Sequence, residues 1–259
     1  MAVYFKEYGD RSAPLMLFLH GGGVSGWMWE QQIQHFAPHY HCVVPDLPGH
    51  GKNYKDTYFS IENTAEKMIQ LIEKVAEERK IIVIGFSLGA QILVQLLSMR
   101  PNLVDYAVIN SALVRPMSLM KKWIGPTVKL TSPLIAIRAF SKIQAKTLYI
   151  PAEKFNQYYE ESRQMRQHTL TRVLEENLSF AIPENFKHVE THMLVIVGEK
   201  EKSMMKKSVM DLLNSNSNCV GMLVADIGHG FALASPAFFL MRRLTIGCRI
   251  PQANQFLFT

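Results

Sequence analysis

The stretch Ile81 to Gly89, IIVIGFSLG, constrains the fold of this chain more than any other part of the sequence. Four apolar residues lead into Gly85-Phe86-Ser87-Leu88-Gly89, and the next eight residues have the spacing of a helix. This order predicts a buried strand, a tight turn and a helix. Because glycine has no Cβ, such a turn can hold Ser87 in a strained conformation, with its hydroxyl exposed at the carboxyl end of the strand. Ser87 is therefore a candidate nucleophile, although the pattern also fits a turn in which it only caps the helix.

Composition indicates one large globular domain. The chain has 259 residues, of which 48% are hydrophobic and 19% are charged, as in ordinary folded proteins. It has no run of 18 apolar residues and no basic start followed by an apolar stretch. We therefore expect a soluble cytoplasmic protein without stable membrane insertion. Three widely spaced cysteines, at 42, 219 and 248, fit reduced thiols in a packed interior.

The positive charge is concentrated in one segment. Residues 112–190 contain 12 Lys and Arg against 7 Asp and Glu, a net of +5, whereas the whole chain carries +6. These cations are not clustered among aromatic residues, so we expect no nucleic-acid partner.

Strands and helices alternate along most of the chain. Apolar runs at 15–19, 41–44, 81–84 and 104–109 are separated by helical segments, which predicts a mostly parallel α/β sheet covered by helices on both faces. The alternation stops at 112–190, where helical pieces are punctuated by prolines, and returns with strands at 193–197 and 219–224. We expect a core of residues 1–111 and 191–259 with a helical insertion at 112–190, and a last helix at about 235–245.

Several loops at the predicted carboxyl ends of the strands carry polar or glycine residues. His20-Gly21-Gly22-Gly23 provides free backbone N–H groups after the run at 15–19, as an oxyanion hole requires. The turn at 46–51 contains Asp46 and His50, to which we assign structural roles. Glu199, Glu201 and His229 follow the two later strands. In a parallel sheet these ends meet at the edge where Ser87 lies.

With these features the chain resembles the α/β-hydrolase superfamily over essentially its whole length. The resemblance rests on five motifs in order: HGGG at 20–23, DLPGHG at 46–51, GFSLG at 85–89, VGEKE at 197–201 and GHG at 228–230. It implies an inserted helical cap, Ser87 as nucleophile and His229 as general base. The implied oxyanion donors are the backbone N–H groups of Gly22 and Leu88. It implies no cofactor, and the sequence shows no metal-ligand spacing.

The triad acid departs from the usual pattern of the superfamily. Glu201 stands where relatives most often have Asp, and glutamate is an accepted variant. Glu199 is the alternative acid, and an incomplete triad is a further reading. After the strand at 104–109, where some relatives keep a substitute acid, this chain has Asn110-Ser111-Ala112.

The resemblance implies a hydrolase of a carboxylic ester or related small acyl substrate, acting through an acyl-enzyme. A carbon-carbon bond hydrolase or the menaquinone-pathway lyase shares this fold and triad. The lyase usually has an arginine soon after the nucleophile, where this chain has Gly89-Ala90-Gln91. A non-hydrolytic ligand-binding or signalling member also fits, because fold alone does not settle function.

The apolar residues at 113–150 are too many for the segment to bury against itself. They fit either plain packing of helices on the core or a roof over Ser87, in which Trp123 lines an acyl pocket. In the second reading Lys121, Lys122, Lys129 and Arg138 give the entrance a positive field suited to anionic substrates. A membrane-surface role is less favoured, because prolines at 126 and 133 would interrupt a long amphipathic helix.

Overall fold

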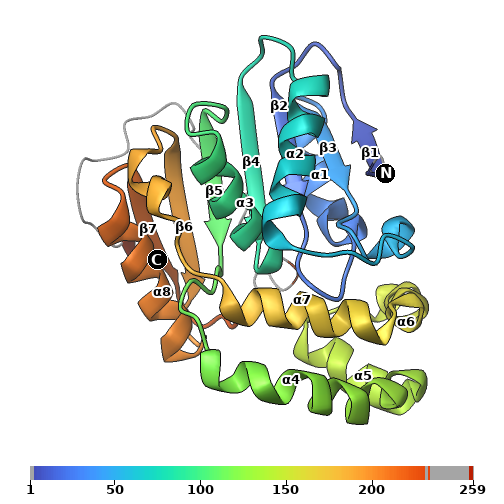
Figure 1. The fold of residues 1–259 in the computed structure, drawn as a ribbon. Helices are drawn as coiled ribbons and strands as arrows, with labels where there is room; N and C mark the ends of the chain where they lie inside the picture. Colours follow the sequence, from blue (N-terminus) through green and yellow to red (C-terminus); the bar gives the residue numbers. More distant parts are fainter. Residues whose placement is uncertain (1–2, 231–232, 234–256, 259) are drawn as a thin grey trace.

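The computed structural model describes residues 3–230, 233 and 257–258; the helix expected at 235–245 and the cysteine at 248 lie outside these residues. The described strands form one sheet in the order β1-β3-β2-β4-β5-β6-β7-β8, in which only β1 runs antiparallel to its neighbour (Figure 1). The strands are β1 Phe5–Tyr8, β2 Leu15–Leu19, β3 His41–Pro45, β4 Ile81–Phe86, β5 Tyr106–Asn110, β6 His192–Gly198, β7 Cys219–Val224 and β8 Leu257–Phe258. The predicted α/β class and mostly parallel sheet are confirmed.

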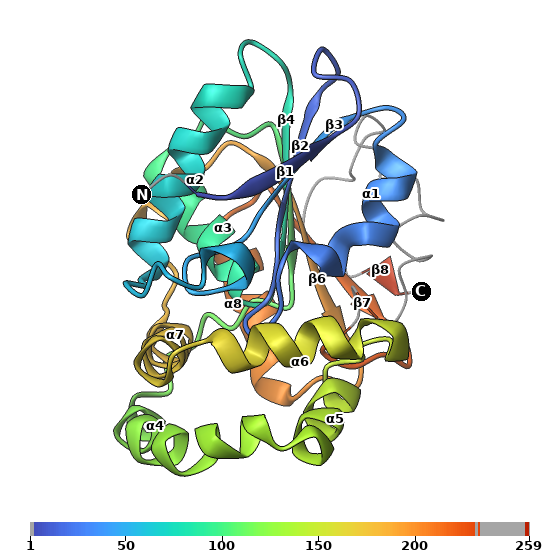
Figure 2. The ribbon, with the colours of Figure 1, turned by 90° about the vertical axis from the view of Figure 1, so that its right-hand side faces the viewer.

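Helices cover both faces of the sheet (Figure 2). One face carries α2 (Ile61–Val75), α3 (Leu88–Met99) and α8 (Ser203–Ser215), and the other carries the short helix η1 (Gly26–Trp29) and α1 (Glu30–Phe36). Successive strand residues point to opposite faces of the sheet, so the side chains of β2 enter two hydrophobic cores, one on each face. Leu15, Leu17 and Leu19 pack with α2 and α3, whereas Met16 and Phe18 pack with η1 and α1.

The segment between β5 and β6 is helical and lies beyond the carboxyl ends of the strands (Figures 1 and 2). It contains α4 (Ser118–Thr131), η3 (Ser132–Ala136), α5 (Arg138–Thr147), η4 (Ala152–Lys154), α6 (Phe155–Gln164), α7 (Gln167–Ser179) and η5 (Glu184–His188). Helices α6 and α7 lie between the sheet and the outer pair α4 and α5. Among residues 3–230, no helix combines the length and apolar character needed to span a bilayer.

The prediction that Pro126 interrupts the helix was wrong. Pro126 lies inside α4, which continues to Thr131. Proline has no N–H to donate to the carbonyl of Lys122 one turn earlier, but both residues are exposed, where a lost helix bond is tolerated. Pro133, by contrast, lies in the first turn of η3, directly after α4 ends.

Side-chain hydrogen bonds tie α6 and α7 to the core. Trp27 Nε1 donates to Glu161 Oε2 at 2.9 Å, and the backbone N–H of Ile61 donates to Glu176 Oε2 at 2.8 Å. Arg172 Nε donates to the carbonyl of Phe59 at 3.2 Å. These bonds link η1 and the start of α2 to helices that follow them by more than one hundred residues, and so fix the space between insertion and sheet.

The loops after β2 and β3 are held together by Asp46 and two buried histidines. Asp46 accepts the backbone N–H groups of Gly26 and Lys52, at 2.9 and 2.8 Å. His20 Nε2 accepts the N–H of Leu47 at 2.9 Å, and its ring meets the edge of His50 at a centroid distance of 5.2 Å. Burial lowers the pKa of His20 to about 4 and that of His50 to about 3. Both rings are therefore neutral, and they rigidify the loops beside Ser87.

These histidines make stability dependent on pH. An unfolded imidazole binds a proton below pH 6.5, whereas native His50 binds one only near pH 3, so the free energy of unfolding falls as the pH drops between these values. His50→Asn should keep a donor for the Pro48 carbonyl and remove this titration. The free energy of unfolding, measured with urea at several pH values between about 6 and 5, should change less steeply with pH in His50→Asn than in the parent. The difference in slope should be up to ~1.4 kcal/mol per pH unit.

The matched control is His188→Asn, because His188 is exposed. The plot of its free energy of unfolding against pH should run parallel to that of the parent. A parallel curve for His50→Asn as well would contradict the proposed linkage.

Candidate active site

Ser87 sits in a strained turn between β4 and α3. Its φ of 52° and ψ of −111° are uncommon for a residue with a Cβ, and its N–H donates to the carbonyl of Asn110 at 2.8 Å. A Cβ at Gly85 would collide with the backbone of Gly89, and one at Gly89 would collide with the carbonyls of Leu19 and His20. The turn therefore needs both glycines, because α3 crosses so closely over the strand ends.

The ring of His229 bridges Ser87 and Glu201. Its Nε2 lies 2.9 Å from Ser87 Oγ, and its Nδ1 lies 2.8 Å from Glu201 Oε2. A neutral ring that donates from Nδ1 to the carboxylate leaves the Nε2 lone pair to accept the serine hydroxyl. The structure thus brings together three side chains separated by up to 142 residues in sequence.

The carboxylate of Glu201 is buried and has three donors. Its side chain is 1% exposed, and it accepts from the Ser111 hydroxyl at 2.7 Å and from the Gly198 N–H at 3.0 Å, in addition to His229. Burial alone would raise its pKa, but the bonds from His229, Ser111 and Gly198 together outweigh burial and lower it. Glu201 is therefore ionised at neutral pH despite its burial.

The turn after β6 decides which glutamate meets the histidine. The N–H of Glu201 donates to the carbonyl of Gly198 at 3.1 Å, which folds the Glu201 side chain back beneath the ring. Glu199 is exposed, and its Oε2 accepts the N–H of Asp226 at 3.0 Å. The Lys200 N–H donates to the carbonyl of Ile227 at 2.8 Å, so the loops after β6 and β7 hold each other in place.

Gly22 and Leu88 lie together beside Ser87. A Cβ built on Gly22 would lie 3.6 Å from Leu88 Cδ2, and one on Gly21 would lie 3.6 Å from the Cβ of Ser87. Both Gly22 and Leu88 line the cavity that Ser87 faces. Leu88 is also the first residue of α3, where backbone N–H groups have no partner within the helix. The glycine-rich loop after β2 and the turn after β4, both named from the sequence, therefore meet beside Ser87.

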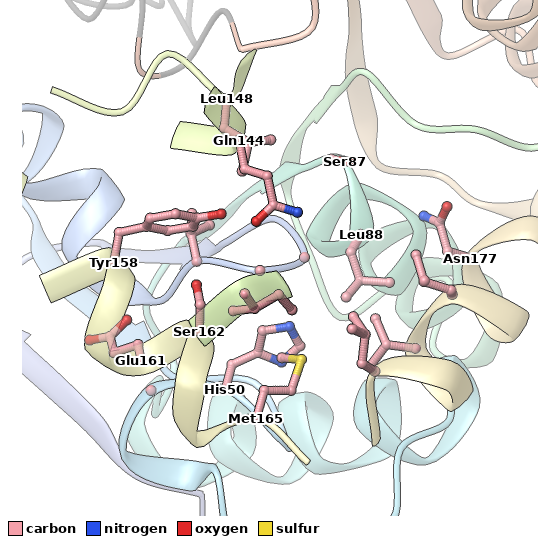
Figure 3. Close-up of a pocket in the computed structure, with 18 residues that line it drawn as sticks. His50, Ser87, Leu88, Gln144, Leu148, Tyr158, Glu161, Ser162, Met165 and Asn177 are labelled. Atoms are coloured by element: carbon pink, nitrogen blue, oxygen red, sulfur yellow. The ribbon is translucent and has the colours of Figure 1, made fainter. Parts of the chain in front are cut away.

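A cavity of about 280 Å³ opens beside Ser87 and is lined by α5, α6 and α7 as well as by the core (Figure 3). Its apolar lining includes Leu88, Leu148, Met165, Val173 and Leu174. Polar side chains reach it from several sides, among them His50, Gln144, Ser162 and Asn177. Among the residues that the structure describes, no group of three or more His, Cys, Asp or Glu could hold a metal ion. A mostly apolar cavity with a few polar groups suits a small organic ligand.

Trp123 does not belong to this site. Its side chain is 71% exposed on α4, and it is absent from the residues that line the cavity. The buried side of α4 is formed by Ile124 and Val128, so the tryptophan points to the opposite side of the helix. The prediction that Trp123 lines the pocket is therefore corrected: α5, α6 and α7 supply the lining.

Several site residues were not assigned from the sequence. Ser111 has φ 57° and donates to Glu201, and its place directly after β5 was the signal that could have identified it. His50 was assigned to the turn alone, yet its ring also lines the cavity. Gln144 and Asn177 lie in the insertion, and no sequence motif marks either of them.

Comparison with protein families gives a match to a model described as alpha/beta hydrolase fold, over residues 14–184. Among curated proteins, an AB hydrolase superfamily protein of Gibberella zeae is 30% identical over 109 residues, which cover 42% of this chain and 38% of that protein. A pimeloyl-[acyl-carrier protein] methyl ester esterase of Vibrio vulnificus is 34% identical over 76 residues, covering 29% of this chain and 28% of that protein. The matches thus span less than two fifths of the length of either relative.

Among solved structures, the chain is similar to MGS-M2, an alpha/beta hydrolase enzyme from a Medee basin deep-sea metagenome library. The TM-score is 0.79 at 17% identity, and the match covers 98% of this chain and 96% of that one. At this identity the likeness concerns the fold.

Proposed function

Because this chain belongs to the alpha/beta hydrolase fold family, we propose that it is a serine hydrolase that cleaves a carboxylic ester or related small acyl substrate. One observation carries the proposal: the two hydrogen bonds, 2.9 and 2.8 Å long, that link Ser87 to His229 and His229 to Glu201 at the edge of an apolar cavity. The esterase among the relatives supports the same class of reaction.

In the proposed reaction Ser87 Oγ attacks the substrate carbonyl carbon while His229 Nε2 takes the hydroxyl proton. The carbonyl π electrons move to the oxygen, and their return expels the alcohol, which receives its proton from His229. The Ser87 ester that remains is cleaved by a water molecule, whose proton passes to the same nitrogen. The acid is released and the serine hydroxyl restored. Glu201, ionised and fixed by three donors, stabilises the imidazolium formed in each half.

The developing oxyanion is proposed to bind the backbone N–H groups of Gly22 and Leu88. Their closeness to Ser87 and their place in the cavity lining support this assignment. In mutagenesis of other hydrolases, removal of one such donor lowers turnover by about 10²- to 10³-fold.

The menaquinone-pathway lyase is a poorer fit to the residues around Ser87. Gln91, in the region where that enzyme usually has an arginine, is fully buried. Its Nε2 donates to the carbonyls of Leu113 and Asn177, at 2.6 and 2.9 Å, and its Oε1 accepts from Asn177 Nδ2 at 2.7 Å. These bonds join α3 to the insertion, which leaves Gln91 a structural role.

Residues 112–190 are proposed to act as the cap of this site, on a core of residues 1–111 and 191–259. The cavity supports this assignment, because eleven of its eighteen lining residues, from Ile135 on η3 to Asn177 on α7, come from the insertion. The cap would thus set the size of the acyl group that fits.

A fluorophosphonate probe tests the nucleophile. It should add one adduct to the intact protein and none to Ser87→Ala, because the bond to His229 activates the serine oxygen. Ser162→Ala, a change in the lining of the same cavity, is the matched control and should be labelled like the parent. An adduct that persists in Ser87→Ala would contradict the assignment.

A series of p-nitrophenyl esters of increasing acyl length tests the pocket. Leu174→Ala enlarges the cavity, so the ratio of kcat/KM for the octanoyl ester to that for the butyryl ester should rise about tenfold. Trp123→Ala should leave the ratio within about twofold, because its side chain points away from the cavity. An unchanged ratio in Leu174→Ala, or an equal shift in Trp123→Ala, would contradict this pocket.

A further inference from the structure

The outer pair of helices exposes an unusual amount of apolar side chain. Of the eleven large hydrophobic residues that are exposed in the described part of the chain, eight lie between positions 119 and 149. We call the exposed side of α4, η3 and α5 the outer helical face; its main apolar residues are Leu119, Trp123, Leu130, Leu134, Ile137 and Ile143. Scattered exposed hydrophobics need no explanation, but a group of this size on one layer marks an interaction surface.

The apolar side chains of α4 form one stripe. On a helical projection Leu119, Trp123 and Leu130 fall within about 40° of one another, roughly opposite the buried Ile124 and Val128. Helix α4 is thus apolar on two sides, of which, among the described residues, the side of Ile124 and Val128 is buried and the other is exposed. Figure 2 shows α4 and α5 as the layer farthest from the sheet, so the second side faces away from the core.

The same layer is strongly basic. Residues 112–152 contain seven Lys and Arg and no Asp or Glu. Lys121, Lys122 and Lys129 are exposed on α4, and Lys142 and Lys146 are exposed on α5. Within the described ranges, none of these five lysines forms an ion pair. The face therefore combines apolar side chains with positive charge that no neighbouring carboxylate neutralises.

We propose that the outer helical face docks on an anionic phospholipid surface. Tryptophan and leucine on one side of a helix, with exposed lysines on the same helix, form the pattern that lies in a bilayer interface, where apolar groups enter the acyl boundary and ammonium groups meet lipid phosphates. An acidic protein would satisfy the lysines, but it would leave the projecting leucines and the tryptophan facing a polar surface. Charge complementarity and the apolar stripe together favour lipid.

The prolines do not prevent this arrangement. Helix α4 continues through Pro126, and Pro133 lies in the first turn of η3, the short helix that connects α4 to α5. Around that turn Leu134 and Ile137 are exposed, while Ile135, between them, lines the cavity beside Ser87. Docking would therefore place η3 between the lipid and the cavity, but it does not depend on the chemistry proposed for Ser87.

Tryptophan fluorescence tests docking on the intact protein. Trp27 and Trp29 are buried, and Trp123 is exposed, so a change on adding lipid reports Trp123. Vesicles of phosphatidylcholine with phosphatidylglycerol should shift its emission to shorter wavelength, and bromine-labelled acyl chains should quench it. Phosphatidylcholine vesicles alone should do neither at the same concentration. No shift with anionic vesicles would overturn the proposal.

Co-sedimentation with the anionic vesicles tests the apolar residues and the lysines of the outer helical face separately. Leu119→Ser with Leu130→Ser should lower binding at least about tenfold, and so should Lys122→Glu with Lys129→Glu. The controls exchange exposed residues elsewhere: Tyr58→Ser with Met210→Ser, and Lys202→Glu with Lys207→Glu, should bind like the parent.

Thermal unfolding and hydrolysis of a soluble butyryl ester, each unchanged in the variants, would show that they fold. Full binding by the leucine variant would overturn the proposal, because attraction by charge alone would then account for the result. Self-association through this face without lipid binding, or binding of an acidic protein alone, would also overturn it.

Discussion

The contact between the buried carboxylate of Glu201 and the ring of His229 is the interaction on which the candidate site depends. A carboxylate that is 1% exposed would take up a proton if burial acted alone, yet donors from β5, β6 and β7 meet it. Ser111 follows β5, Gly198 ends β6 and His229 follows β7. One ionised group therefore fixes three strand ends relative to the Ser87 turn on β4.

The parts of this arrangement that rest on local chemistry could be predicted from the sequence. An apolar run followed by Gly85-Phe86-Ser87-Leu88-Gly89 predicted the strand, the turn and the helix, because only glycines allow so close an approach of strand and helix. The alternation of strands and helices likewise predicted a mostly parallel sheet. The loops at its carboxyl edge were then expected to meet, as those of His229 and Ser87 do.

The remaining parts depend on contacts that sequence patterns do not encode. Glu199 and Glu201 follow the same strand, and the turn closed by the Gly198 carbonyl selects between them. Trp123 was placed in the pocket because an apolar count does not reveal which side of a helix faces inward, and α4 has two apolar sides. Pro126 was expected to interrupt a helix that in fact continues, because Pro126 and Lys122, to whose carbonyl it cannot donate, both lie on the exposed side of α4.

We propose that Ser87 performs acyl transfer while His229 and Glu201 control its proton. The most direct measurement compares kcat/KM for p-nitrophenyl butyrate in Glu201→Gln and Glu199→Gln, two changes that remove the same charge two residues apart. We expect a loss of about 10³- to 10⁴-fold for Glu201→Gln, because an amide cannot hold the imidazole in the tautomer that accepts the serine proton. We expect a loss of no more than about threefold for Glu199→Gln, because the Glu199 carboxylate accepts the Asp226 N–H in the loop beside the site and does not contact the His229 ring. Equal and small losses in the two variants would contradict the claim.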